Sequence, residues 1–386
     1  MSCDVFFYVQ HLLGIGHIRR AALIARACSE AGLAVTFASG GEPVAGLALG
    51  GAEFLQLDPP LRSADSLFSR LETPDGSGLD DAIGARRREQ LLAAFEARRP
   101  RVLLTEMFPF GRRNMRFELT PLVERAKTAP WRPALASSVR DILTATGNRA
   151  KIDWIVATVE RFYDRVLVHG DPALVPFELT FPDASRIADR IAYTGYVVDH
   201  APARSQAVAP SGEVLVSTGG GAVADPLVEA AFGARALSPL ADAPWRVLIG
   251  DNLPEPRFRA FRQAAPEGVI VERSRPDFLA LLAACRLSLS QAGYNTTLEV
   301  LAAGRPAVVV PFAAGQESEQ SLRARLLAEQ GRLVVVEEAG ITAESLAAGI
   351  ARALALPPAP PMQFALDGAA RSAEILAGLA RHGSGR

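Results

Sequence analysis

The fold of this chain is decided by the stretch Leu287-Ser288-Leu289-Ser290-Gln291-Ala292-Gly293-Tyr294-Asn295-Thr296-Thr297-Leu298-Glu299. It opens with an apolar run that predicts a buried strand, turns at Gly293, and continues into an apolar helix. A strand, a glycine-rich turn and a helix also open each half of the chain, and short apolar runs alternate with helical stretches along most of the sequence. Strands that alternate with helices are typical of parallel sheets covered by helices on both faces, so we expect an α/β protein.

Outward from this stretch, short apolar runs predict a series of strands in each half of the chain. The clearest helices cover 19–31 and 80–98, and an amphipathic helix over 366–380 closes the sequence. The alanine- and proline-rich segment Ala201–Pro210 lacks periodicity and indicates a linker. The expected strands are 5–10, 34–38, 53–56, 102–105, 134–138 and 165–169, then 214–217, 246–249, 269–271, 287–289, 307–310 and 333–336.

The length and composition agree with two domains. At 386 residues the chain exceeds the roughly 250–300 residues at which single cores stop growing. We predict a Rossmann-like lobe over 1–203, a second over 211–360, and a C-terminal helical segment over 361–386 that packs toward the first lobe. The two parallel sheets are expected to face a central cleft, with ligands at the carboxyl ends of the strands.

Charge and cysteine content exclude several classes of protein. The formal net charge of −1 supplies no field for nucleic acid, so no nucleic-acid partner is expected. The three cysteines have no metal-ligand spacing and indicate reduced core thiols. The N-terminus lacks the pattern of a signal peptide, and the apolar runs are too short to span a bilayer. These features predict a cytoplasmic protein with at most peripheral contact at the inner face of the membrane.

The turn after the first predicted strand carries a candidate base. Its sequence, Gly14-Ile15-Gly16-His17, lacks the third glycine of a dinucleotide fingerprint. An imidazole at a helix N-terminus tends to stay neutral and can accept a proton, so His17 is a candidate general base. The alternative is that His17 caps the helix or hydrogen-bonds the loop.

The second half offers a candidate phosphate site. Gly293 allows a close turn, and the first-turn amides of the following helix point toward an anion. Glu299, one turn further, suits two vicinal ribose hydroxyls, although it could instead compensate the helix dipole. Gln320 follows the next strand and could reach a sugar hydroxyl. The Ser-Thr-Gly-Gly-Gly turn that opens this half, residues 217–221, borders the same place.

A basic region in the first half is a candidate acceptor site. Residues 86–132 contain 12 basic and 5 acidic residues. Arginines beside aromatic side chains suit a phosphorylated, acidic or lipid-phosphate group, although a solvated arginine face is the alternative. Glu106, at a strand end, is a second candidate base. The acceptor candidates are Phe110, Arg112, Arg113 and Arg140.

Together the Gly-x-Gly-His-x-x-Arg start, the Ser-Thr-Gly-Gly-Gly turn and the stretch Gln291–Gln320 resemble the GT-B glycosyltransferases, most closely family 28. The resemblance implies a UDP-sugar in the second lobe, with Glu299 on the ribose, the turn after Gln291 near the diphosphate and Gln320 on the donor sugar. It also implies His17 beside the reacting centre. The predicted donor-binding set is Gly16, Thr218, Gly219, Gly220, Gly221, Gln291, Gly293, Tyr294, Asn295, Thr296, Glu299 and Gln320.

The sequence thus predicts a transferase that moves a hexose or N-acetylhexosamine from a nucleotide diphosphosugar to an acceptor hydroxyl. No Asp-x-Asp motif or His/Cys cluster is present, so neither a metal nor a cofactor other than the nucleotide sugar is expected. The thin first loop also resembles UDP-sugar hydrolases of nonulosonic acid synthesis, which tend to be shorter. A nucleotide-sugar binding protein and a sugar epimerase are further alternatives.

Overall fold

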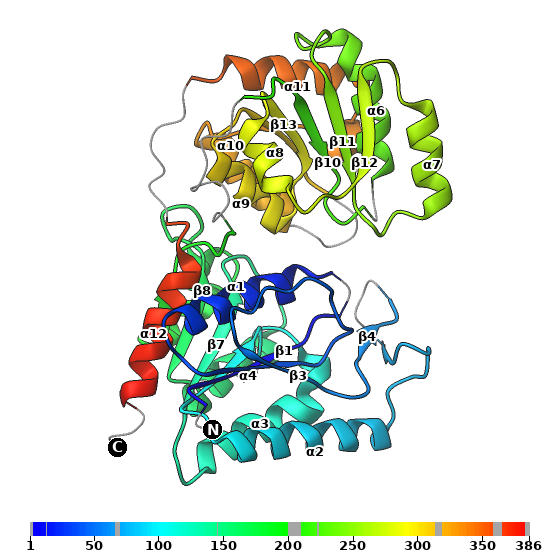
Figure 1. The fold of residues 1–386 in the computed structure, drawn as a ribbon. Coiled ribbons are helices and arrows are strands. Elements are labelled where there is room, and N and C mark those ends of the chain that lie inside the picture. The colour runs from blue at the N-terminus through cyan, green and yellow to red at the C-terminus, as the bar shows by residue number, and fades with distance from the viewer. Residues whose placement is uncertain are drawn as a thin grey trace. The chain divides into compact units, whose positions relative to one another are not determined.

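The computed structural model describes residues 3–12, 14–65, 70–144, 146–199, 210–221, 224–312, 319–357 and 365–382. The chain forms two compact units, Met1–Val197 with Phe364–Arg386, and Val198–Gln363 (Figure 1). The predicted linker Ala201–Pro210 lies almost wholly outside the described residues. Among the residues described, no helix combines the length and the apolar character that a membrane crossing requires.

The first unit is built on a sheet of seven parallel strands in the order β3-β2-β1-β6-β7-β8-β9. The side chains of strand β1 point alternately to the two faces of this sheet, because successive residues of a strand face opposite sides. The strands are β1 Val5–Val9, β2 Val35–Ser39, β3 Glu53–Gln56, β6 Val102–Glu106, β7 Ala134–Arg140, β8 Arg165–His169 and β9 Ile191–Tyr193.

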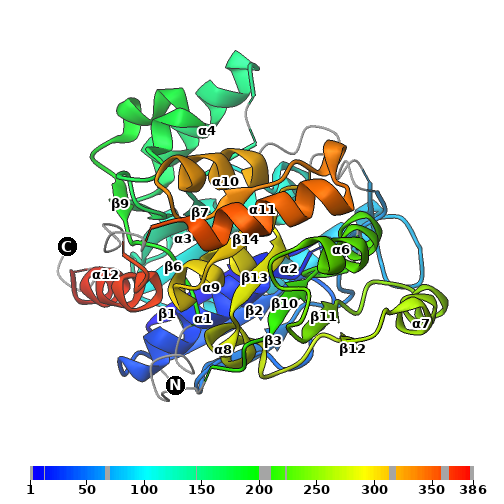
Figure 2. The same cartoon turned by 90° about the horizontal axis from the view of Figure 1, so that it is seen from above.

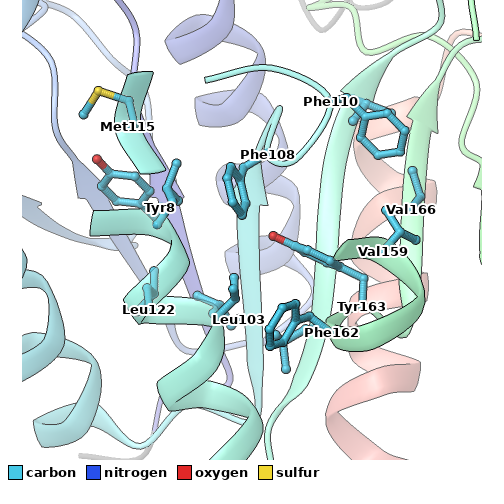
Figure 3. Packing of buried hydrophobic residues seen from close by; sticks show 14 of the residues in the cluster. Tyr8, Leu103, Phe108, Phe110, Met115, Leu122, Val159, Phe162, Tyr163 and Val166 are labelled. Atoms are coloured by element: carbon cyan, nitrogen blue, oxygen red, sulfur yellow. The ribbon is translucent and has the colours of Figure 1, made fainter. Parts of the chain in front are cut away.

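Helices cover both faces of this sheet. On one face, α1 (Gly16–Glu30) and α12 (Gly368–His382) pack against each other and against Val5, Phe7 and Val9 of β1 (Figure 1). The C-terminal helix therefore belongs to the first unit. On the other face lie α2 (Asp81–Arg98), α3 (Arg116–Thr128) and α4 (Arg149–Phe162). Figure 3 shows the core that they share, with Tyr8, Leu103, Phe108 and Tyr163 among its members.

The second unit holds six parallel strands in the order β12-β11-β10-β13-β14-β15. Helix α11 packs beside α6, as Figure 2 shows. The strands are β10 Val214–Ser217, β11 Trp245–Ile249, β12 Val269–Arg273, β13 Leu287–Gln291, β14 Ala307–Val310 and β15 Val334–Val335. The helices are α6 Asp225–Leu237, α7 Glu255–Ala264, α8 Phe278–Ala284, α9 Tyr294–Ala303, α10 Glu319–Glu329 and α11 Ala343–Ala355.

The prediction of an α/β protein with two parallel sheets is confirmed. Pattern reading missed three short elements of the first unit, namely β9 and the two-stranded antiparallel sheet of β4 (Arg62–Ser63) and β5 (Leu71–Glu72). A strand of two or three residues is too short for alternating hydrophobicity to show. Among the residues described, the first unit also contains the 3₁₀ turns η1 (Arg113–Met115), η2 (Phe177–Leu179) and η3 (Pro182–Ile187), and the second contains η4 (Glu338–Gly340).

Candidate functional site

The first unit gathers its candidate residues where the strand order reverses. From β1 the chain crosses to β2 on one side, and β6 lies on the other. Ligands of open α/β sheets bind at the carboxyl ends of the strands at such a reversal. The loop after β1 leads into α1 with His17 in its first turn, and Glu106 is the last residue of β6. The sheet order thus brings together two residues that are 89 positions apart.

His17 and Glu106 form a hydrogen-bonded pair. His17 Nδ1 lies 2.9 Å from Glu106 Oε1, and Arg20, one turn along α1, also pairs with Oε1. An ionised carboxylate only accepts hydrogen bonds, so Nδ1 carries the imidazole proton and Nε2 keeps the lone pair. The side chain of Glu106 is fully buried, whereas that of His17 is 17% exposed. This is the geometry of a histidine base oriented by a carboxylate.

Burial and three arginines keep His17 neutral. Desolvation holds its pKa well below the ordinary 6.5, and the positive charges of Arg140, Arg112 and Arg20 lower it further. Burial also lowers the pKa of Arg112 to about 10, with Arg140 and Arg20 contributing, so Arg112 remains a cation at neutral pH. Its Nε donates to the backbone oxygen of Gln10 at 2.6 Å. The predicted acceptor residues Arg112 and Arg140 therefore share one electropositive site with the candidate base.

The buried histidines predict a loss of stability in mild acid. Burial lowers the pKa of His11 to about 4, and those of His17 and His169 lie well below 6.5. Below pH 6.5 the unfolded chain binds protons that the folded chain does not, so the free energy of unfolding falls as pH drops from 6.5 toward 4. Each histidine contributes at most about 1.4 kcal/mol per pH unit. Urea unfolding at pH 7.0, 6.0 and 5.0 measures this slope.

The pH series has an internal check. Replacing one of these residues, as in His11→Gln, is expected to flatten the slope between pH 6.5 and 5, because one proton-binding difference is removed. A carboxylate with a lowered pKa, such as Glu53, loses its contribution to stability mainly below about pH 5, so it changes the slope in this window little. A free energy of unfolding that is constant from pH 7 to pH 5 would contradict the prediction.

Two of the predicted acceptor residues lie elsewhere. Phe110 is 6% exposed and packs edge-on against Phe177 and Phe181, at centroid distances of 5.6 and 5.3 Å. Its described contacts are therefore those of a core residue. Arg113 is exposed in a 3₁₀ turn. Burial lowers the pKa of Lys151, and the positive charge of Arg113 lowers it further. Neither placement adds support to their predicted contact with an acceptor.

A buried ion pair fixes the loops that carry this site. Arg87 of α2 forms a two-point contact with Glu118 of α3, through Nε at 3.0 Å and Nη2 at 2.9 Å, and both side chains are fully buried. Arg87 also donates to the Gly40 oxygen after β2 at 3.0 Å and to the Pro59 oxygen after β3 at 2.6 Å. Its Nη2 reaches Gln10 Oε1 at 3.1 Å, just after β1. One guanidinium thus holds three neighbouring strand-end loops.

The second unit repeats the arrangement at β10 and β13. These strands are neighbours at the reversal of its sheet, with Ser217 paired to Ser290. The glycine-rich turn follows β10 directly, with φ +57° at Gly219 and +85° at Gly221, and Thr218 is fully buried. A Cβ at Gly250, after β11, would clash with the backbone of Gly219 and Gly220. The turn therefore packs backbone against backbone, which only glycine permits.

Helix α9 begins at the end of β13, beside that turn. Gly293 is its N-cap, and no side-chain hydrogen bond caps the helix among the residues described. Asn295 and Thr296 are half-buried in its first turn, and Glu299 is half-buried one turn further. Amide groups of a first turn such as this one attract phosphate oxygens.

Two side chains of α10 support the same end of the sheet. Arg323 is 1% exposed, and its guanidinium lies 4.7 Å from the ring centroid of Tyr294 in α9. Arg323 also pairs with Glu319 at 3.0 Å. Gln320 accepts a hydrogen bond from the Phe312 amide at 3.0 Å. Its contact with the donor sugar stays a prediction. The loop between Phe312 and Glu319 lies outside the described residues.

Several residues of these sites escaped sequence reasoning. Each of them has only a weak signal in the sequence. Arg20 is the last residue of the Gly-x-Gly-His-x-x-Arg pattern, Gly250 directly follows a strand, and Arg323 stands among apolar helix positions. Gly16, a predicted donor residue, is the first residue of α1 beside His17 and belongs to the first unit.

Comparison with known proteins finds a family profile that matches part of the chain. The sequence profile of the glycosyltransferase family 28 C-terminal domain matches residues 214–372, which include both loops at the reversal of the second sheet. A curated relative from Rhodospirillum centenum, a UDP-N-acetylglucosamine–N-acetylmuramyl-(pentapeptide) pyrophosphoryl-undecaprenol N-acetylglucosamine transferase, is 35% identical over 113 residues. That match covers 27% of this chain, and the chain spans only 30% of the length of that relative.

Solved structures match over almost the whole chain. MurG from Acinetobacter baumannii has a TM-score of 0.58 at 16% identity, with 98% of each chain covered. The spinosyn rhamnosyltransferase SpnG complexed with thymidine diphosphate has a TM-score of 0.60 at 18% identity, with 98% of this chain and 96% of that chain covered. At these identities the likeness shows the fold, which is that of the GT-B glycosyltransferases. The chain therefore has the GT-B fold, and residues 214–372, most of which lie in its second unit, are similar to the C-terminal domain of glycosyltransferase family 28.

Proposed function

We propose that this chain is a glycosyltransferase that moves a hexosyl or N-acetylhexosaminyl group from a UDP-linked donor to the hydroxyl of an anionic acceptor. The observation that carries the proposal is the His17–Glu106 pair at 2.9 Å, at the sheet reversal of a unit joined to a family 28 domain. The transferases that resemble the chain support transfer, and none of those described above is a hydrolase.

The donor is assigned to the second unit. The first-turn amides of α9 suit a diphosphate, and the Glu299 carboxylate suits the two ribose hydroxyls. The relative from R. centenum is named for a UDP-sugar donor, and SpnG was solved with a nucleoside diphosphate. Both facts favour a nucleotide diphosphosugar here. We assign neutralisation of the leaving diphosphate to the helix terminus and propose that transfer needs no metal.

The acceptor is assigned to the first unit by its charge. Arg20, Arg112 and Arg140 all lie near enough to His17 to lower its pKa. Guanidinium groups bind phosphate and carboxylate oxygens through paired hydrogen bonds, so a phosphorylated or otherwise acidic acceptor suits the site. The R. centenum relative is named for a pyrophosphoryl lipid acceptor, which has the same chemistry.

The proposed reaction uses each of these groups once. The acceptor hydroxyl oxygen attacks the anomeric carbon, and His17 Nε2 takes the hydroxyl proton as the new bond forms. The bond from the anomeric carbon to the diphosphate oxygen breaks, and the diphosphate leaves with the electron pair. The amides of α9 stabilise that negative charge. Glu106 orients the imidazole and offsets the positive charge that it acquires.

A thermal-shift screen with UDP, UDP-glucose, UDP-N-acetylglucosamine, GDP and TDP tests the donor assignment. A ligand that binds only the folded chain raises its melting temperature, so uridine nucleotides are expected to give the largest rise. Glu299→Gln is expected to weaken UDP binding about ten- to hundred-fold, because hydrogen bonds to a charged group contribute about 1.5–3 kcal/mol.

The control for this variant is Glu329→Gln. Glu329 lies in the same unit, is 63% exposed and lies 3.9 Å from Arg325. The Glu329→Gln variant should leave UDP binding unchanged. The donor assignment would be wrong if no nucleotide raised the melting temperature, or if the two variants weakened UDP binding equally.

A further inference from the structure

A buried chain of polar side chains extends behind the His17–Glu106 pair. Ser138 Oγ lies 2.6 Å from Glu106 Oε2 and 2.8 Å from His169 Nε2. On the far side, His169 Nδ1 lies 2.9 Å from Thr194 Oγ1. These side chains come from the carboxyl ends of β6, β7 and β8 and from the residue that follows β9, and each is at most 2% exposed.

The proton positions along this chain follow from the charge on Glu106. An ionised carboxylate accepts only, so the single hydroxyl proton of Ser138 points to Glu106 Oε2. Ser138 Oγ must then accept from His169, which places the imidazole proton of His169 on Nε2. His169 Nδ1 in turn accepts from the Thr194 hydroxyl. Burial holds the pKa of His169 well below 6.5, so it stays neutral with a single tautomer in neutral solution.

The opposite arrangement is also available to these atoms. A donor at the Oε2 position would turn the Ser138 hydroxyl toward His169 Nε2 and move the imidazole proton to Nδ1. His169 would then donate to Thr194, whose hydroxyl would turn to the Gly195 oxygen at 2.8 Å. The chain therefore has two discrete states, and it ends at backbone oxygens of buried residues. Its described contacts hold the carboxylate in place, and its four side chains are all buried.

We propose that Ser138 and His169 are positioning residues that hold the ionised Glu106 carboxylate on His17, and that the tautomer of His169 reports the charge at Glu106. The catalytic part of this inference rests on the proposed function, whereas the tautomer belongs to the free protein. With Glu106 ionised, the contacts from Glu106 to Ser138, from Ser138 to His169 and from His169 to Thr194 each have one donor and one acceptor, and the Thr194 hydroxyl turns from the Gly195 oxygen to His169. Buried networks of this kind rigidify the group that they surround.

Nitrogen NMR of the free protein tests the tautomer. The chain has five histidines, so labelling histidine with ¹⁵N gives few ring signals, and a His169→Gln sample identifies those of His169. The wild type is expected to show the proton of His169 on Nε2. In Glu106→Gln the amide oxygen faces Arg20 and the amide nitrogen faces Ser138. The proton of His169 is therefore expected on Nδ1.

The tautomer result decides the inference without any activity measurement. A wild type with the proton on Nδ1, or a Glu106→Gln variant in which it stays on Nε2, would overturn the proposed network. Failure of the proposed function is a different result, namely absence of nucleotide binding or sugar transfer, and it would leave the tautomers as they are.

Kinetics test the positioning role with a matched pair of serines. Ser138→Ala is expected to lower kcat about ten- to hundred-fold with little change in the donor KM, because the carboxylate loses its support but the donor site does not change. Ser137→Ala is the control, since Ser137 is equally buried in β7 and donates to the Phe108 oxygen at 2.7 Å. Equal losses of kcat in the two variants would contradict a positioning role. If Ser138→Ala does not fold, the tautomer measurement still decides.

Discussion

His17→Ala is expected to lower kcat about 10²–10⁴-fold, the usual contribution of a positioned general base. Donor binding should persist, because the donor is assigned to the second unit and His17 belongs to the first. The expected pattern is therefore a loss in kcat with an unchanged UDP dissociation constant. The kcat is measured as the rate of sugar transfer by the wild type and by His17→Ala, and measuring it in EDTA also tests the proposed independence from metal. Calorimetry with UDP gives the dissociation constant.

The double variant sharpens this prediction. If His17 and Glu106 act as one unit, His17→Ala combined with Glu106→Gln should lose little more kcat than His17→Ala alone. Additive losses would mean that the two residues act independently. A kcat for His17→Ala within threefold of the wild type would exclude His17 as the base.

The same variant separates the alternatives that the sequence leaves open. A hydrolase would release sugar and UDP in water without an acceptor, and His17→Ala would abolish that release. A nucleotide-sugar binding protein would have no turnover to lose. An epimerase would form a sugar isomer in the absence of an acceptor.

Arg87→Met is expected to destabilise the first unit by about 3–5 kcal/mol, the loss typical when one partner of a buried ion pair is removed. The variant would leave the Glu118 carboxylate buried without its cation, although the hydrogen bond from the Tyr8 hydroxyl would remain. It would also remove the donors to the backbone oxygens of Gly40 and Pro59. Unpaired buried groups of this kind carry a full desolvation penalty.

Chemical unfolding and hydrogen exchange measure this effect. Because the chain has two units, exchange should rise in peptides of the first unit and stay constant in those of the second. Arg86→Met is the matched control, since Arg86 pairs with Asp58 at the surface and both side chains are more than half exposed. Its expected cost is below about 1 kcal/mol. Adding Glu118→Leu to Arg87→Met should restore part of the lost stability, because no carboxylate is then left buried without its cation. The assigned role of Arg87 would be contradicted if Arg87→Met were as stable as Arg86→Met.

Arg86 and Arg87 also show which structural features a sequence can predict and which it cannot. Arg86, Arg87 and Arg88 look alike as a basic run, yet Arg87 alone shares a helical stripe with the buried Leu91 and Phe95, four and eight residues on. That spacing predicts which arginine points inward. It does not predict Glu118 as the partner, because α3 is brought beside α2 only by the packing of both helices on one face of the sheet.

The same distinction holds for the candidate site. His17 and Glu106 each follow a predicted strand, so the sequence identified both, but as competing bases. Their pairing depends on β6 lying next to β1, a strand order that no local pattern encodes. His169 also ends a predicted strand, and its role became visible only through Ser138 on the strand between it and Glu106. Strand ends are thus readable from sequence, whereas the order of strands in the sheet is not.

The second unit was easier to read, because most of its candidate residues lie in two short contiguous stretches, with Gln320 as the exception. The turn after Gln291 and the glycines after Thr218 are local features, and the prediction needed only their adjacency. Gly250 was missed because its constraint is close approach to another loop, which a single glycine after a strand does not reveal.

The most direct measurement is the position of the nucleotide in a crystal of this protein grown with UDP. The predicted result is a diphosphate on the first-turn amides of α9, with both ribose hydroxyls on the carboxylate of Glu299. A crystal whose second unit stays empty at saturating UDP, or in which the Glu299 side chain makes no contact with the ribose, would contradict the assignment of the donor site.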